Sequence, residues 1–283
     1  MPFGFGRRSS CEFTTKVCNL NKLRSAPLFK RYEAKEFTHE GIAVIDVTEV
    51  LALHEATVGL WHLQPIENTY HGWSNIVCQQ HIFNFELWHQ EDIARSPAVT
   101  ETQIATVKRA IDRLNQARND HVEKIDDWIT EQLESRSISP SSEARQNTET
   151  PGSAIDRLSI MALRLYHYEE QLQRDDVGED HVQRMHVRIA LCRAQKNDLS
   201  QSLRELIDDI LAGRKRHKTY RQMKMYNDPS LNPYLYAPNK VRPALATHPT
   251  VIRLFDDSEN RERIALSELC RILMGDWVCH RNL

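Results

Sequence analysis

Five potentially cationic side chains interrupt the apolar stripes of three predicted helices. The interruptions fall near the midpoints of helices predicted over residues 100–135, 150–174 and 180–212. In an antiparallel bundle these midpoints lie at the same depth, so the side chains should meet in one layer of the core. The five residues are Arg118, His121, Arg164, His167 and Lys196. Such a layer needs counter-charge, either from internal acids or from an anionic ligand.

An anionic ligand in this layer implies a division of roles among the side chains around it. Guanidinium and ammonium groups suit phosphate or carboxylate, and the anion-binding candidates are Arg118, Arg164 and Lys196. Imidazole titrates near neutral pH, and the candidates for proton transfer are His89, His121 and His167. The acids expected at the pocket wall are Glu86, Asp92, Asp112 and Asp156. The competing interpretation is a set of structural ion pairs inside the core.

Metal binding has two possible sequence signals. Glu86 and His89 form an E-x-x-H pair on one helical face, as di-iron bundles require, but those bundles need two such pairs and we find one. We therefore favour a hydrogen-bonded interfacial histidine and expect no tightly held transition metal. A polar face of the 100–135 helix suits magnesium, as in all-α nucleotide pyrophosphohydrolases, but their acidic pairs are not matched and such a face is more often simply solvated; its residues are Asp112, Asn115, Asn119, Glu123 and Asp126.

The elements that must position these residues are helices. Asp46 or Thr48 can cap a helix that ends near Leu63, and a second helix should run from Trp73 to Arg95. Thr100 and Gln103 form a capping box for the third. The fourth begins at Thr150 or Ser153 with Pro151 in its first turn, and the fifth is followed by Gly213. A short sixth helix is predicted over 218–226.

We therefore predict an all-α fold, an antiparallel helical bundle, with residues 43–233 as its core domain. An irregular N-terminal arm over 1–42 precedes the core. A Pro-punctuated C-terminal extension over 234–283 follows, with a terminal helix predicted from about Ser258 to Trp277.

Composition excludes several function classes. The net charge of -2 gives no bulk attraction to nucleic acid or to a membrane surface, and the nine glycines form no phosphate-binding loop motif. The six cysteines are scattered without a CxxC pair, as in reduced cytoplasmic proteins. No apolar run approaches the roughly 18 residues of a membrane span. We expect a cytoplasmic protein with no nucleic-acid partner.

Four motifs in order resemble a bacterial family known as domain of unknown function 4254, over roughly residues 45–233. The motifs are Leu87–Arg95, Ile111–Asp120, Glu149–Ile160 and Lys224–Asp228. Members of that family tend to be encoded near glycosyltransferases for surface polysaccharide. The resemblance implies a context but no reaction.

Two functions follow as expectations. In the first, the polar layer binds a phosphorylated small molecule such as a nucleotide-sugar, and can act on it in surface polysaccharide synthesis. In the second, the protein is a non-catalytic helical accessory or interaction partner of a glycosyltransferase, and the layer only fixes the packing of the bundle. We expect no cofactor except possible magnesium. The sequence settles neither enzymatic activity nor oligomeric state.

Overall fold

The computed structural model describes residues 45–223 and 230–231. The chain divides into two compact units, Met1–Ile45 and Asp46–Leu283, and the second is described here by itself. Its elements are α2 (Val47–Trp61), α3 (Gly72–Ala94), α4 (Glu101–Ser135), β1 (Arg145–Gln146), α5 (Pro151–Gln171), α6 (Glu179–Leu211) and β2 (Lys215–Arg216). None of the helices in the described ranges is long and apolar enough to cross a membrane.

Helix ends follow the capping chemistry of the sequence. The Asp46 carboxylate accepts a hydrogen bond from the backbone N–H of Thr48 at the start of α2. Thr100 and Gln103 form the capping box of α4. Thr150 caps α5, with Pro151 at its first position, where no N–H is needed. These local signals predict the three capped ends because they depend on near neighbours in sequence.

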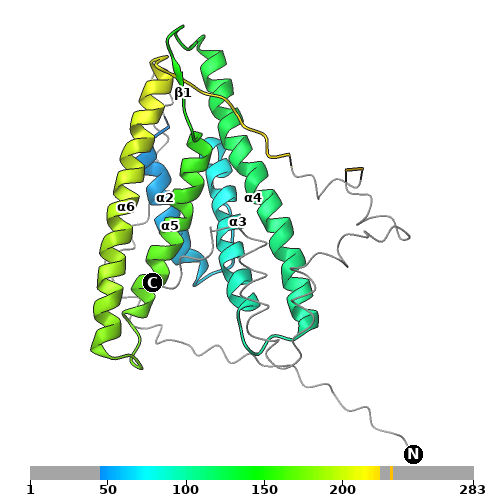
Figure 1. Cartoon of the computed structure of the whole chain (residues 1–283), viewed down its shortest axis with the longest axis vertical. Coiled ribbons are helices and arrows are strands. Elements are labelled where there is room, and N and C mark those ends of the chain that lie inside the picture. Colours follow the sequence, from blue (N-terminus) through cyan, green and yellow to red (C-terminus); the bar gives the residue numbers. More distant parts are fainter. Residues whose placement is uncertain (1–44, 224–229, 232–283) are drawn as a thin grey trace, which may run out of the picture. The chain divides into compact units, whose positions relative to one another are not determined.

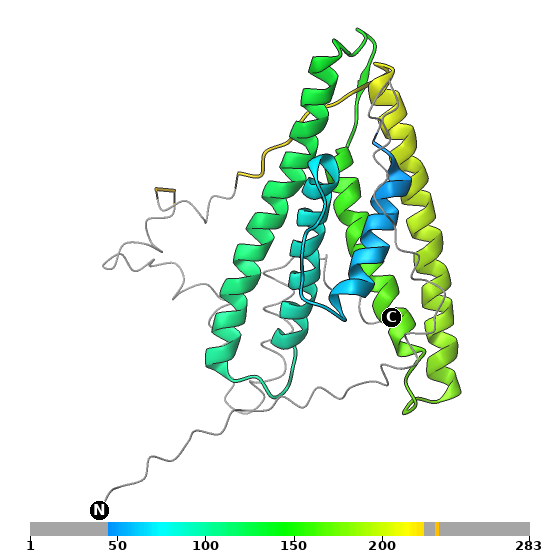
Figure 2. The same ribbon diagram turned by 180° about the vertical axis from the view of Figure 1, so that it is seen from behind.

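The helices pack as two adjacent pairs with α2 against both. Leu87 of α3 packs with Val107 and Ile111 of α4. On the other side, Met161 and Leu165 of α5 pack with an apolar stripe of α6. Figures 1 and 2 show α3 beside α4 and α5 beside α6, with α2 next to α3 and α5. The all-α fold is confirmed, while the antiparallel order of a bundle stays a prediction.

Residues 213–222, which we call the α4 strap, leave the end of α6 and run along α4 (Figure 1). Gly213 adopts a φ of 71°, which favours glycine, and turns the chain. β2 then pairs in parallel with β1, with Arg145 opposite Lys215. The predicted helix over 218–226 is wrong for its described part, 218–223, which is not helical. The reason is that Arg221 and Gln222 bond to acids of α4 instead.

Two predicted segments fall largely or wholly outside the described residues. The N-terminal arm over 1–42 is one, and the extension over 234–283 with its terminal helix is the other. The boundaries of the predicted core domain, 43–233, therefore stay a prediction.

Candidate functional site

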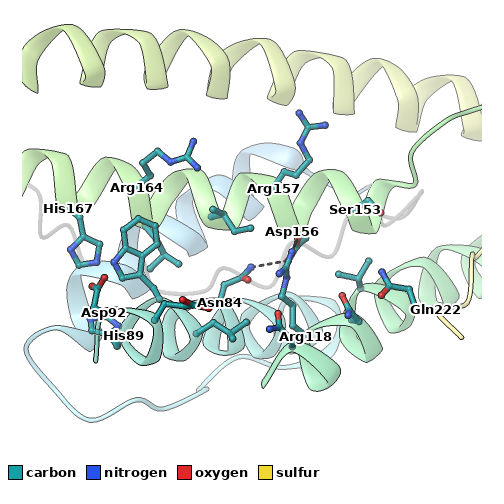
Figure 3. A pocket seen from close by; sticks show the side chains of 18 of the residues that line it. Asn84, His89, Asp92, Arg118, Ser153, Asp156, Arg157, Arg164, His167 and Gln222 are labelled. Carbon is teal, nitrogen blue, oxygen red and sulfur yellow. Dashed lines mark hydrogen bonds and ion pairs between the residues drawn. The ribbon is translucent and has the colours of Figure 1, made fainter. Parts of the chain in front are cut away.

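A cleft of about 1460 Å³ opens between α3, α4 and α5. Figure 3 shows His89, Asp92 and His167 together at one end of it, and Ser153 and Gln222 at the other. The cleft therefore has a histidine end and a strap end. Of the predicted site residues, seven line it: His89, Asp92, Asp112, Arg118, Asp156, Arg164 and His167.

Asp156 is the centre of a buried network in the middle of the cleft. Its carboxylate accepts two hydrogen bonds from Arg118, from Nε at 2.8 Å and from Nη2 at 2.6 Å. Gln80 and Asn84 of α3 also donate to it, at 2.5 and 3.0 Å. Burial opposes the charge on Arg118, but the ion pair raises its pKa above the usual value. The network as a whole ties α3, α4 and α5 together, and this arrangement fits the structural interpretation of Arg118.

Arg164 differs from Arg118 in its partners. It is half-buried on α5 and lines the cleft, yet it forms no ion pair or hydrogen bond with any residue from 45 to 223. In Figure 3 its side chain and that of Arg157 project from the same face of α5, on the side toward α6. Arg157 pairs with Glu149 at 2.7 Å. Arg164 is therefore the cation of the cleft wall best placed to receive an anion.

The histidine end contains three imidazoles from three different segments. His62 caps the C-terminus of α2, His89 lies on α3 and His167 on α5. One ring nitrogen from each lies within 4.8 Å of the other two, and all three side chains are half-buried. Burial lowers the pKa of His62. The hydrogen bond from His167 lowers the pKa of Glu170, which accepts at 3.2 Å.

Three predicted site residues do not line the cleft. Lys196 is 7% exposed and forms an ion pair with Glu55 of α2. His121 bonds to the carbonyl of Ala117 in its own helix and packs edge-on against Phe83. Glu86 is half-buried, and burial raises its carboxyl pKa. The single shared cavity expected for the five cationic side chains is thus wrong for Lys196 and His121, because equal depth along two helices does not fix which way a side chain points.

The acids of the predicted magnesium face are engaged within the protein. Asp112 pairs with Lys108, and Glu123 accepts from the α4 strap at Gln222. Asp126 is 2% exposed and accepts from the backbone N–H of Gly152 at 2.8 Å. Burial raises the pKa of Asp126. Asp126 and Glu123 thus hold the start of α5 and the α4 strap against α4, whereas Asp112 pairs within its own helix.

A family model described as Protein of unknown function (DUF4254) matches residues 74–219, more than half of the 283 residues. The chain belongs to this family. The DUF4254 segment begins within α3 and contains the later elements through β2, and with them His89, His167 and the Arg118–Asp156 pair. His62 precedes the segment. Comparisons with curated proteins and with solved structures find no match.

Sequence reasoning missed two features of the site. Gln80, Asn84 and Ser159 complete the Asp156 network, and their signal was polar residues on otherwise buried faces of α3 and α5. His62 was missed because it joins His89 and His167 only through the packing of α2, which no local spacing reveals.

Proposed function

We propose that the cleft binds a phosphorylated small molecule, such as a nucleotide-sugar. The observation that carries this proposal is Arg164, a residue of the cleft lining that has no acidic partner among the described residues. A guanidinium that is partly desolvated and unpaired is poorly stabilised until an anion binds. Its planar fork matches two oxygens of a phosphate.

The lining of the cleft supports a ligand with both charged and neutral polar parts. Small-molecule sites typically enclose roughly 300–1,000 Å³, so a volume of about 1460 Å³ accommodates a nucleotide-sized ligand. Carboxylates such as Asp92 and Asp112 also line the cleft and can accept hydrogen bonds from sugar hydroxyls. We further propose a cytoplasmic location, because Cys78 and Cys192 are free thiols, as reducing compartments favour.

Thermal denaturation of the full chain with inorganic phosphate, UDP or UDP-glucose tests the proposal. A ligand that binds only the native state raises the melting temperature, so wild type should shift upward with at least one of the three. Arg164→Met should remove the shift. Arg193→Met is the matched control, because Arg193 is an exposed arginine of α6 outside the cleft that pairs with Glu169.

Stability without ligand distinguishes Arg164 from Arg118, which both line the cleft. Arg164→Met strands no described acid, so it should cost little free energy of unfolding. Arg118→Met leaves Asp156 buried and unpaired and should cost about 3–5 kcal/mol. The proposal fails if none of the three compounds shifts wild type, or if Arg164→Met responds as wild type does.

A further inference from the structure

The histidine end of the cleft supports a second inference, which does not depend on the proposed phosphorylated ligand. We propose that His62, His89 and His167 bind one divalent transition-metal ion, with zinc as the best match. One nitrogen of each ring already lies within 4.8 Å of the others. Zinc–nitrogen bonds of 2.0–2.1 Å place tetrahedral ligand atoms about 3.3 Å apart, so ring movements of about 1 Å complete the site.

The second nitrogen of each ring is held as metal-binding histidines require. The Nδ1 atoms of His62 and His89 lie 2.7 and 2.8 Å from the carbonyl oxygens of Val58 and Phe85. The Nδ1 atom of His167 lies 3.2 Å from the carboxylate of Glu170. Because these acceptors carry no proton, each Nδ1 donates, and the lone pair of each neutral ring is on Nε2. This arrangement fixes the tautomer and strengthens the ligand.

Two of the remaining ring nitrogens are buried without a hydrogen-bond partner, and a bound metal ion would remove the free-energy cost of leaving them so. The Nε2 atoms of His62 and His167 are buried and form no hydrogen bond in the described part of the chain. Buried polar atoms without a partner are rare in folded proteins, and each one calls for an explanation. One ion bound by both atoms satisfies them together.

Aromatic neighbours hold the rings in place before any ion binds. His62 stacks on Tyr166 with ring centroids 4.1 Å apart, and His167 stacks on Trp88 at 4.9 Å with only 6° between the planes. His89 packs against Phe85 at 4.4 Å. Binding therefore orders little that is not already ordered, and preorganisation of this kind favours affinity.

Ligand chemistry selects the metal. Imidazole nitrogens suit zinc, copper and nickel, whereas magnesium and calcium prefer oxygen ligands. Three protein ligands leave the fourth position of a tetrahedral zinc ion for water or for a ligand oxygen. Because all three histidines line the cleft, that position is reachable from it.

The test uses the full chain, freed of metal by a chelator and titrated with zinc by calorimetry and with cobalt(II) by visible absorption. Wild type should bind one zinc per chain and give the cobalt spectrum of a four-coordinate, nitrogen-rich site. His89→Gln and His167→Gln should each abolish this binding. His186→Gln, an exposed histidine of α6, is the matched control and should bind as wild type does.

Glu170→Ala separates a built site from casual histidine binding. Glu170 is exposed, with 53% of its side chain accessible, so the variant should fold. Losing a carboxylate that orients a metal ligand lowers affinity by roughly 10–100-fold while one zinc per chain is kept. The proposal is overturned if wild type binds no zinc, if the histidine variants bind as wild type does, or if Glu170→Ala leaves affinity unchanged. Phosphate and UDP are absent throughout, so the result is independent of the proposed cleft ligand.

Discussion

The contact between α4 and the start of α5 leaves no room for a side chain at Gly152. A Cβ placed there would lie 2.6 Å from the carbonyl oxygen of Val122 and 2.9 Å from the side-chain carbon Cγ of Asp126. The first obstacle is backbone and cannot move without displacing α4. The second is the carboxylate that accepts the Gly152 N–H. Gly152→Ala must therefore push the two helices apart or break that hydrogen bond.

The size of the effect follows from two opposing contributions. Replacing glycine by alanine in a helix gains at most about 0.5–1 kcal/mol from backbone entropy. Overpacking a tight contact costs roughly 1–3 kcal/mol, and an unsatisfied buried carboxylate adds to that cost. We expect Gly152→Ala to lower the free energy of unfolding by about 2 kcal/mol. For a domain of this size that is a drop in melting temperature of about 4–8 °C.

Gly59→Ala is the internal control. Gly59 lies inside α2, and a Cβ added to it would meet nothing within 4 Å, so this change should stabilise the protein by about 0.5–1 kcal/mol. Urea unfolding followed by circular dichroism measures both variants. A Gly152→Ala protein as stable as wild type would refute the close approach of α4 and α5, and with it the placement of the strap end of the cleft.

Three further predictions use the same unfolding measurements. Burial lowers the pKa of His81 to about 3, below the usual value of about 6.5, so folding opposes protonation of this ring. The contribution of neutral His81 to stability is therefore complete above pH 6.5 and is lost as the pH falls toward 3. The loss should reach about 2 kcal/mol at pH 5 and be absent in His81→Asn. Thr150→Ala removes the cap of α5 and should cost about 1 kcal/mol, whereas Thr106→Ala on exposed α4 should not destabilise. Lys196→Met should cost less than about 1 kcal/mol, because Glu55 reaches solvent when its partner is lost.

Helix ends were predictable because they are encoded within a few residues. Asp46, the Thr100–Gln103 box and Thr150–Pro151 each act on backbone groups of their own first turn. The same locality explains the error after α6. Arg221 and Gln222 bond to residues of α4 almost a hundred positions earlier, and no short window of sequence contains those partners.

The polar interruptions of the apolar stripes were informative in one respect only. Their depth along each helix was predictable, and Arg118, Arg164 and His167 do line one cleft. The direction in which each side chain points from its helix was not predictable, because it depends on how the helices pack, and α6 packs against both α5 and α2. Lys196 faces Glu55 of α2 for this reason. The pairing of Arg118 with Asp156 also needs the register between α4 and α5, which is a tertiary property.

The α4 strap is synthesised after the helices that it contacts, so the strap end of the cleft is completed late in folding. Its Arg216 bonds to the carbonyl of Ala144, and its His217 donates to the carbonyl of Asp126. These partners leave the ribosome long before residues 213–222 exist, so α3, α4 and α5 can assemble first with this end uncovered. Contacts between such distant residues form late and slow the final folding step. A nascent chain ending before residue 213 should therefore be helical yet readily cleaved by protease at the α4–α5 junction, and extension through residue 222 should protect it.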